Sequence, residues 1–249
     1  NMVPMRSPLL LLALLLPAFS QPAAPSADDL EAVVTTPLGA FRFEFAPAKA
    51  PKHVEAFIER ARAGYYDGSA FHRAVAWGII QGGDPLLKNP KTPKNLWGSG
   101  GLNLLKGNYS DMKHERGVVS TVRIPDKPDS DGAQFFVCVN AQPPLDGKFS
   151  AFGRVTEGMD VVEKISQVPT GENGFTNVPV RIDKVTIEPK KREPYVDTPI
   201  DKLPRVVKLP TTLGVIEITL EPAWAPNHVR AFLKLLETGW YSGTTFHRI

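Results

Sequence analysis

The segment from residue 132 to residue 139, GAQFFVCV, constrains the fold most, because as a β-strand it is apolar on both faces. Side chains alternate along a strand, so Gln134, Phe136 and Cys138 share one face, while Phe135 begins the other. Gln134 is the polar exception. An unpaired buried amide costs about 1–3 kcal/mol, so the sequence predicts that Gln134 has a hydrogen-bond partner.

A second segment, FHRAVAWGIIQGGDP at residues 71–85, places a cation and an amide on half-buried strand backbone. The same alternation puts Phe71 beside Arg73 and Ile79 beside Gln81. The Gly-Gly pair that follows ends the strand or lets backbone pass close to another group. Two interpretations of Arg73 stay open here: a structural arginine paired with a buried carbonyl, or part of a functional site.

Short strands separated by turns dominate the rest of the pattern, in a chain of ordinary globular composition with 42% hydrophobic and 22% charged residues. A helix is predicted from Pro51 to Gly64, since its apolar residues recur at helical spacing. The other elements predicted are strands at 33–36, 41–45, 117–124 and 178–188, and a short helix at 160–165. Short strands with two helices predict a closed β-barrel.

The N-terminus has the features of a secretory signal peptide over residues 1–20. Arg6 supplies the positive charge, and the apolar core Leu9–Leu16 is too short to span a bilayer. Residues 21–31 are rich in Pro, Ala and Ser and are predicted to be a flexible lead-in. We therefore expect a periplasmic or secreted protein with no stable membrane anchor after cleavage; an uncleaved anchor is the alternative.

Charge and cysteine content exclude several functions. A formal net charge of +3 is too small and scattered to indicate nucleic-acid binding. The single cysteine, Cys138, permits no intramolecular disulfide, and its strand position indicates a buried, unreactive thiol. The histidines lack the spacing of metal ligands, so neither a metal nor a cofactor is expected. The sequence does not indicate an oligomeric state.

The start of the chain repeats after a charged, Pro-rich linker at residues 191–204. Each matching segment follows its counterpart by 175 residues, as Pro226 follows Pro51. The matches are APKHVEAF with APNHVRAF and GYYDGSAFHR with GWYSGTTFHR. The repeat, residues 205–249, has Arg248 but lacks the QGG and GAQFFV segments, so we expect a truncated second domain. Alternatively, it packs on the first domain or on another chain.

The ordered motifs over residues 32–190 resemble the cyclophilin family of peptidyl-prolyl cis–trans isomerases, most closely its bacterial members. The motifs are FHR (71–73), QGGDP (81–85), GAQFFV (132–137), LDGK (145–148) and FGRV (152–155). The resemblance implies a mainly β fold: a closed eight-stranded antiparallel barrel capped by two helices, followed by an incomplete second copy. It implies proline-containing peptides and unfolded proteins as partners.

The resemblance also implies roles for individual side chains. Arg73 would donate to the nitrogen of a twisted prolyl bond, and Gln81 would orient Arg73. Gln134 would hold the substrate backbone or the rotating carbonyl. The proline ring would rest on Phe136 as the floor of its pocket. Ile79 and Leu145 would form the walls of that pocket.

Several pocket positions depart from the family pattern. The usual pocket phenylalanine is Gly78, so Trp77 either refills the space or leaves the pocket shallower. The family's Ala-Asn pair that binds substrate backbone is Val122-Arg123, and the histidine that often follows LDGK is Phe149. We therefore include Trp77, Val122 and Phe149 among the expected substrate-binding residues.

Two functions follow from these residues. The first is a prolyl isomerase that assists the folding of exported proteins by electrostatic stabilisation of the twisted bond. The second is a non-catalytic peptide-binding or chaperone module on the same fold, since a fold alone does not establish activity. The set formed by Arg73, Gln81, Gln134 and Phe136 favours the isomerase, because a binding module need not retain it.

Overall fold

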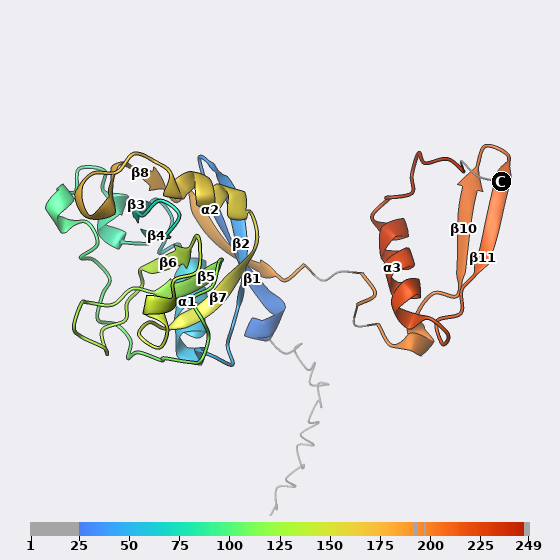
Figure 1. Cartoon of the computed structure of the whole chain (residues 1–249), viewed down its shortest axis with the longest axis horizontal. Coiled ribbons are helices and arrows are strands. Elements are labelled where there is room, and N and C mark those ends of the chain that lie inside the picture. The colour runs from blue at the N-terminus through green and yellow to red at the C-terminus, as the bar shows by residue number, and fades with distance from the viewer. Residues whose placement is uncertain (1–24, 192–193, 197, 247–249) are drawn as a thin grey trace, which may run out of the picture. The chain divides into compact units, whose positions relative to one another are not determined.

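The structure, a computed structural model, describes residues 25–191, 194–196 and 198–246 (Figure 1). The predicted signal peptide, the first part of the lead-in and Arg248 lie outside the described residues. The chain divides into two compact units, with the boundary between Ile187 and Glu188. Within the described ranges, no helix has both the length and the apolar character needed to cross a membrane.

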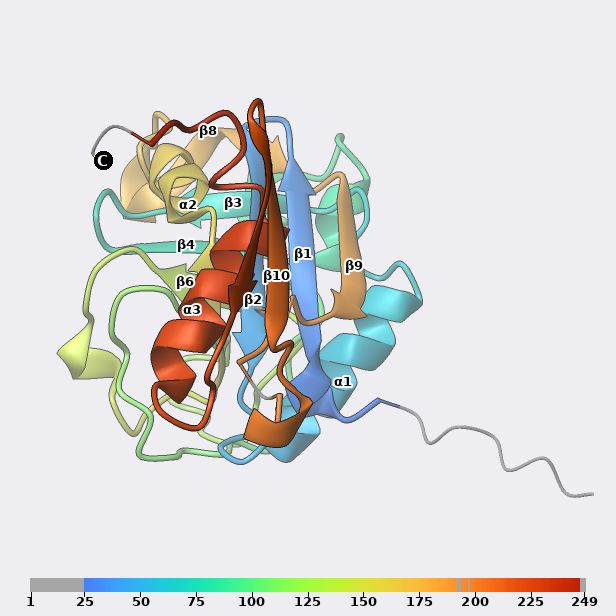
Figure 2. The same cartoon turned by 90° about the vertical axis from the view of Figure 1, so that its right-hand side faces the viewer.

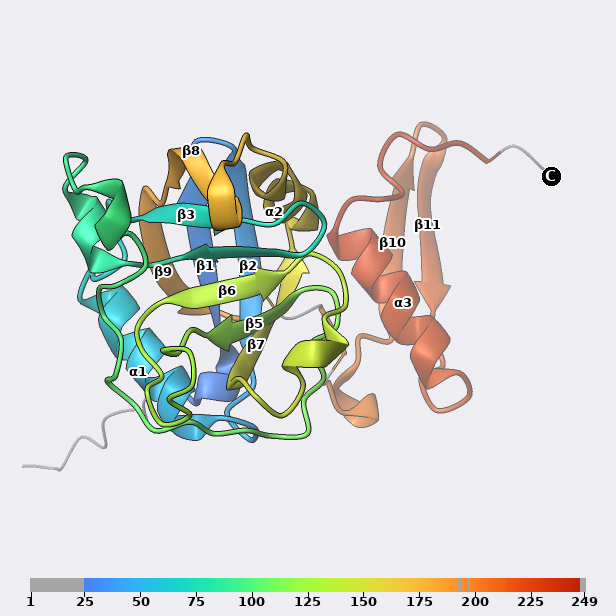
Figure 3. The same ribbon diagram turned by 60° about the vertical axis from the view of Figure 1, so that its left-hand side comes forward.

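Most of the first unit is one curled β-sheet (Figure 3). Its strands are β1 (Leu30–Thr36), β2 (Gly39–Phe45), β3 (Ala70–Ala74), β4 (Ile79–Gly82), β5 (Val118–Thr121), β6 (Phe135–Cys138), β7 (Ala151–Glu157), β8 (Phe175–Arg181) and β9 (Lys184–Pro189). They lie in the order β8-β3-β4-β6-β5-β7-β2-β1-β9, and consecutive strands from β8 to β1 pair antiparallel.

The described sheet has nine strands instead of the expected eight, because the predicted last strand, 178–188, is divided into β8 and β9. Ile182 and Asp183 separate the two halves. The Ile182 N–H donates to the Ser69 carbonyl beside β3, and the Asp183 N–H donates to the Thr35 carbonyl in β1, each at 2.8 Å. At this bend the chain therefore leaves β8, which lies at one end of the strand order, and enters β9, which lies at the other end.

The two α-helices of the described first unit are α1 (Pro51–Arg62) and α2 (Met159–Ser166), and they lie at opposite ends of the curled sheet (Figures 1 and 3). This confirms the two predicted helices. Helix α1 starts with proline, whose missing N–H is harmless in the first turn. Its residues Val54, Phe57 and Ala61 recur at helical spacing and are buried against the sheet.

Short 3-10 turns occupy several connections. They are Ala27–Asp29, Pro85–Lys88, Lys94–Leu96, Pro143–Leu145, Glu172–Gly174 and Ile200–Lys202. Because the first of these turns leads directly into β1 at Leu30, secondary structure begins inside the segment that was predicted to be a flexible lead-in.

Phe57 is the centre of the aromatic core. Its ring stacks on Tyr66 at 4.8 Å between centroids. It also contacts the rings of Phe43, Phe135 and Phe152, with centroids 5.3, 5.6 and 5.4 Å away. These four neighbours come from β2, β6, β7 and the turn after α1, so one side chain connects the helix to three strands. Burying large aromatic surfaces is among the main stabilising contributions in a core of this size.

The second unit repeats the first elements of the first unit. It contains β10 (Val206–Thr211), β11 (Gly214–Thr219) and α3 (Pro226–Glu237), and α3 lies against the β10–β11 hairpin (Figure 2). The bounds of α3 and the first residue of β11 lie 175 residues after those of α1 and β2. The repeat seen in the sequence is therefore also a repeat of secondary structure.

Apolar side chains of the second unit are more exposed to solvent than the residues at the matching positions of the first unit. Leu203, Val229 and Leu233 are buried and form a small core, so the predicted linker contributes one of its residues to packing. By contrast, Ile216 is 42% exposed, whereas Phe41, its counterpart in the first unit, is fully buried.

We predict that Phe57→Ala lowers the free energy of unfolding of the first unit by about 3–5 kcal/mol, the cost of emptying a packed aromatic site. Phe232→Ala changes the matching position of the second unit, which is only partly buried. It should leave the unfolding of the first unit unchanged. Denaturant titrations followed by near-UV circular dichroism measure both effects. Equal losses in the two variants would contradict the central role of Phe57.

We also predict that the first unit becomes less stable as pH falls from 7.5 to 5. Burial lowers the pKa of His72 and of His114 below their ordinary value. Below about pH 6.5 the unfolded chain therefore binds protons that the folded chain does not, which favours unfolding. His72→Phe should flatten this dependence when urea unfolding is measured at both pH values. An unchanged slope in that variant, or greater stability at pH 5, would contradict the prediction.

Candidate active site

Four residues form a row across neighbouring strands of the first unit. Arg73 in β3 is opposite Gln81 in β4, Gln81 is opposite Phe136 in β6, and Phe136 is opposite Ser120 in β5. Figure 3 shows these strands side by side in that order. Residues directly opposite each other in antiparallel strands place their side chains on the same face. The register therefore brings the predicted cation, amide and aromatic floor to one surface of the sheet.

Arg73 is half-buried and held at one nitrogen. Its Nε donates to the carbonyl of Asn173 at 2.9 Å. Asn173 is near because β8, which begins two residues later, pairs with β3 and sets Phe175 opposite Arg73. The terminal nitrogens of Arg73 have no hydrogen-bond partner among the described residues. Burial lowers the pKa of Arg73, but a guanidinium stays charged at physiological pH. The arginine is thus anchored while its outer N–H groups remain available.

The two glutamines are hydrogen-bonded to each other. Gln81 Nε2 donates to Gln134 Oε1 at 3.1 Å. Gln134 Nε2 donates to the carbonyls of Gly98 and Gly100 at 2.9 and 2.6 Å. Gln134 therefore has the partners that its burial requires. Its side chain is fully buried, so in this conformation it contacts Gln81 and the glycine loop while Gln81 stays partly exposed.

Asp84 fixes the glycine loop, residues 97–101, from the other side. Its buried carboxylate accepts hydrogen bonds from the Gly98 N–H at 2.7 Å and the Gly100 N–H at 3.3 Å. A Cβ on Gly98 would lie 3.2 Å from His72 Nε2, and its φ of +82° favours glycine. The sequence analysis did not predict this contact, although the chain shows both the aspartate of QGGDP and a glycine-rich segment at residues 98–101.

An apolar cluster surrounds Phe136 on the same face. Its buried members are Val118, Phe136, Cys138 and Ala151, and its partly buried members are Ile79, Met112, Val122, Leu145 and Phe149. The structure thus brings together Phe136 and the four residues Ile79, Leu145, Val122 and Phe149 that were expected to bind substrate with it. Trp77 is not in this cluster: it lies in the turn between β3 and β4, is 54% exposed and has a φ of +59°.

His114 supports Phe136 and was not anticipated from the sequence. The two rings stack with centroids 5.9 Å apart and planes 16° from parallel. The His114 ring nitrogens are within hydrogen-bond distance of Ser120 Oγ at 2.9 Å and Asp146 Oδ1 at 3.2 Å. Asp146 also accepts the backbone N–H of His114 at 2.8 Å. These contacts set the orientation of the ring on which Phe136 rests.

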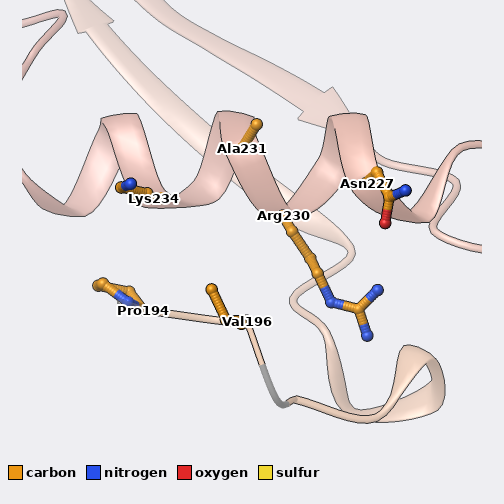
Figure 4. Close-up of a pocket in the computed structure, with 6 residues that line it drawn as sticks. All are labelled: Pro194, Val196, Asn227, Arg230, Ala231 and Lys234. Carbon is orange, nitrogen blue, oxygen red and sulfur yellow. The ribbon is translucent and has the colours of Figure 1, made fainter. Parts of the chain in front are cut away.

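Two other features of the described chain contribute no reactive group to this surface. Burial raises the pKa of the Cys138 thiol to about 12, which agrees with an unreactive core residue. In the second unit, a hollow of about 320 Å³ lies between α3 and residues 194–196 (Figure 4). There Arg230 donates to the carbonyls of Tyr195 and Thr198 at 3.0 and 2.6 Å, so it has a structural role in that unit.

A protein-family comparison agrees with the motifs. The family model described as cyclophilin type peptidyl-prolyl cis-trans isomerase matches residues 32–187 and also residues 206–249. Together these ranges include the strands that carry the candidate site and the repeated elements of the second unit.

Curated relatives match mainly the first unit. The peptidyl-prolyl cis-trans isomerase CYP71 of Arabidopsis thaliana is 35% identical over 160 residues, which are 62% of this chain and 24% of the relative. The smaller isomerase CYP18-2 of the same plant is 34% identical over 154 residues, 59% of this chain and 87% of the relative. The chain thus spans about a quarter of the length of several longer relatives that it matches.

Solved structures give the same result for the fold. A cyclophilin type peptidyl-prolyl cis-trans isomerase of Cryptosporidium parvum, crystallised in the presence of the dipeptide Ala-Pro, is 25% identical with a TM-score of 0.56. The similarity covers 64% of this chain and 99% of that one. From its motifs, its fold and the family match, the chain belongs to the cyclophilin-type peptidyl-prolyl cis–trans isomerase family.

Proposed function

We propose that the protein is a peptidyl-prolyl cis–trans isomerase that assists the folding of exported proteins. The observation that carries the proposal is the row from Arg73 to Phe136, which places an anchored guanidinium next to an apolar cluster with a partly exposed edge. Strands of a sheet lie roughly 4.8 Å apart, so Arg73 and Phe136 are two strand spacings apart, within reach of an arginine side chain.

The chemistry requires electrostatics and no covalent step. Amide resonance gives a prolyl bond a rotation barrier of about 18–20 kcal/mol. Twisting the bond ends this resonance and localises a lone pair on the proline nitrogen. A catalyst must bind the twisted form better than either planar form. The free terminal N–H groups of Arg73 supply a preorganised donor for that nitrogen, and the Asn173 carbonyl prevents the side chain from turning away.

The neighbouring residues bind and position. The proline ring rests on Phe136, with Ile79, Leu145, Val122 and Phe149 around it. Gln81 orients Arg73 from the opposite strand and is itself held by Gln134. Gln134 is buried, so we propose that it holds Gln81 and the glycine loop in position and does not contact the substrate directly. Trp77 contacts longer peptides from the exposed turn next to Gly78.

We extend the proposal to location and domain organisation. The signal-like residues 1–20 support export to the periplasm or secretion from a bacterial cell. The repeated elements at 206–211, 214–219 and 226–237 support a second cyclophilin-like domain. Expression in a bacterial host, cell fractionation and N-terminal sequencing of the mature chain test the export: a start near Gln21 is expected, and an uncleaved cytoplasmic chain would contradict it.

We predict that Arg73→Ala lowers kcat/KM for isomerisation of an Ala-Pro peptide by about 10²–10³-fold, the usual cost of removing one transition-state donor. Arg73→Lys should recover part of the loss, because it restores the charge without the fork of N–H groups. Arg62→Ala, at an exposed position near the end of α1, is the matched control and should be unaffected.

Two outcomes would count against the proposal. A wild-type rate no faster than the spontaneous process, which takes roughly 10–100 s, would favour the non-catalytic peptide-binding or chaperone module. Catalysis that persists in Arg73→Ala would remove the role of this side chain while leaving an isomerase.

We predict that Gln134→Glu lowers both activity and stability. The change removes the two N–H donors and sets a carboxylate against the carbonyls of Gly98 and Gly100, so the free energy of unfolding should fall by about 1–3 kcal/mol. The amide NMR signals of both glycines should shift and kcat should fall, since Gln81 loses its support. Gln167→Glu, at an exposed position, measures the effect of the added charge alone. Unchanged glycine signals in Gln134→Glu would contradict this arrangement.

A further inference from the structure

Arg123 lies at the margin of the apolar cluster and is held there by three contacts. Its guanidinium carbon lies 5.0 Å from the centroid of the Phe149 ring. Its Nε donates to the Lys148 carbonyl at 3.0 Å, and one terminal nitrogen donates to the Ile124 carbonyl at 3.4 Å. An arginine stacked on an aromatic face and hydrogen-bonded to backbone has a restricted orientation. This cation is therefore a fixed feature of the candidate site.

The charge of Arg123 is not neutralised by the protein. No carboxylate in the described part of the chain forms an ion pair with it. The cluster's own acidic neighbour, Asp146, instead accepts from His114 and lies 3.5 Å from Lys113 Nζ. Lys148, next in sequence to Phe149, adds a second exposed cation. Neither Arg123 nor Lys148 forms an ion pair with a carboxylate of the described residues.

The separation between Arg123 and the proposed proline floor suits a short peptide. The Phe149 ring meets the Phe136 ring edge-on with centroids 5.4 Å apart. The distance from Phe136 to the guanidinium is thus at most the sum of this value and the 5.0 Å to Arg123. An extended peptide covers such a distance in about three residues, at roughly 3.3–3.6 Å each.

We propose that Arg123 determines substrate specificity by binding a carboxylate within three residues of the proline, so that the protein prefers acidic proline-containing peptides. The inference rests on the proposed function, because it takes Phe136 as the floor under the proline ring. Arg123 pairs with the Asp or Glu side chain of the peptide at the margin of the site. The pair adds affinity for the substrate without taking part in the rotation.

Matched peptides test the preference. Peptides with Glu or Gln at each of the three positions before and after one proline are compared by kcat/KM and by fluorescence-anisotropy Kd. For an exposed ion pair, Glu should be preferred over Gln by about two- to fivefold at one or two of these positions. The preference should appear in KM and Kd, with kcat unchanged, and should fall as ionic strength rises. Those positions also show which side of the proline faces Arg123.

Variants identify the residue. Arg123→Gln should bring the Glu-to-Gln ratio to one, and Arg123→Lys should retain part of the preference. Lys52→Gln removes one charge from the exposed face of α1 and should leave the ratio unchanged. A ratio of one in the wild type at every position, or a preference that survives Arg123→Gln, would overturn the inference.

These measurements distinguish failure of the proposed isomerase activity from failure of the proposed role of Arg123. An unaccelerated neutral Ala-Pro peptide would reject the isomerase, while the Kd ratios would still decide whether Arg123 selects carboxylates. Acceleration of the neutral peptide with no preference for Glu in either measurement would reject the role of Arg123 and leave the isomerase in place.

Discussion

The register that sets Arg73 opposite Gln81, and Gln81 opposite Phe136, is the constraint on which the candidate site depends. A slip of one residue in β4 or β6 would move these side chains to the other face of the sheet. Such a slip would be costly in β6, because it would turn the buried amide of Gln134 away from Gln81 and the glycine loop. It would also exchange residues between the main core, which holds Phe135 and Val137, and the cluster beside the site, which holds Phe136 and Cys138. The packing that stabilises the sheet therefore also positions its chemistry.

A chain of polar contacts then connects the row to distant loops. Asp84 binds the N–H groups of the glycine loop, the loop carbonyls bind Gln134, and Gln134 binds Gln81. At the other end, the carbonyl of Asn173 holds Arg73. From Asp84 to Gln81, each polar group has a hydrogen-bond partner in the next, as buried polar groups require. The result is a site whose outer N–H groups keep their orientation before a peptide arrives, which is the condition for electrostatic catalysis.

Sequence patterns predicted the local features better than the distant contacts. Alternation correctly placed Phe136 and Cys138 on one face of β6, and helical spacing gave α1. The contacts of Gln134 with the glycine loop, and of Arg73 with a carbonyl one hundred residues away, depend on loop conformations that no periodicity encodes. The bend at Ile182, which makes nine strands of an expected eight, depends on tertiary pairing with two different strands.

The most direct test of the account is side-chain NMR of Arg73 during titration with an Ala-Pro peptide. We expect the terminal N–H signals of Arg73 to shift and to exchange more slowly with solvent. The Nε–H signal, already bound to the Asn173 carbonyl, should change little. Shifts at Phe136 with no change in the terminal N–H signals of Arg73 would show that the peptide binds without meeting the guanidinium, and would contradict the account.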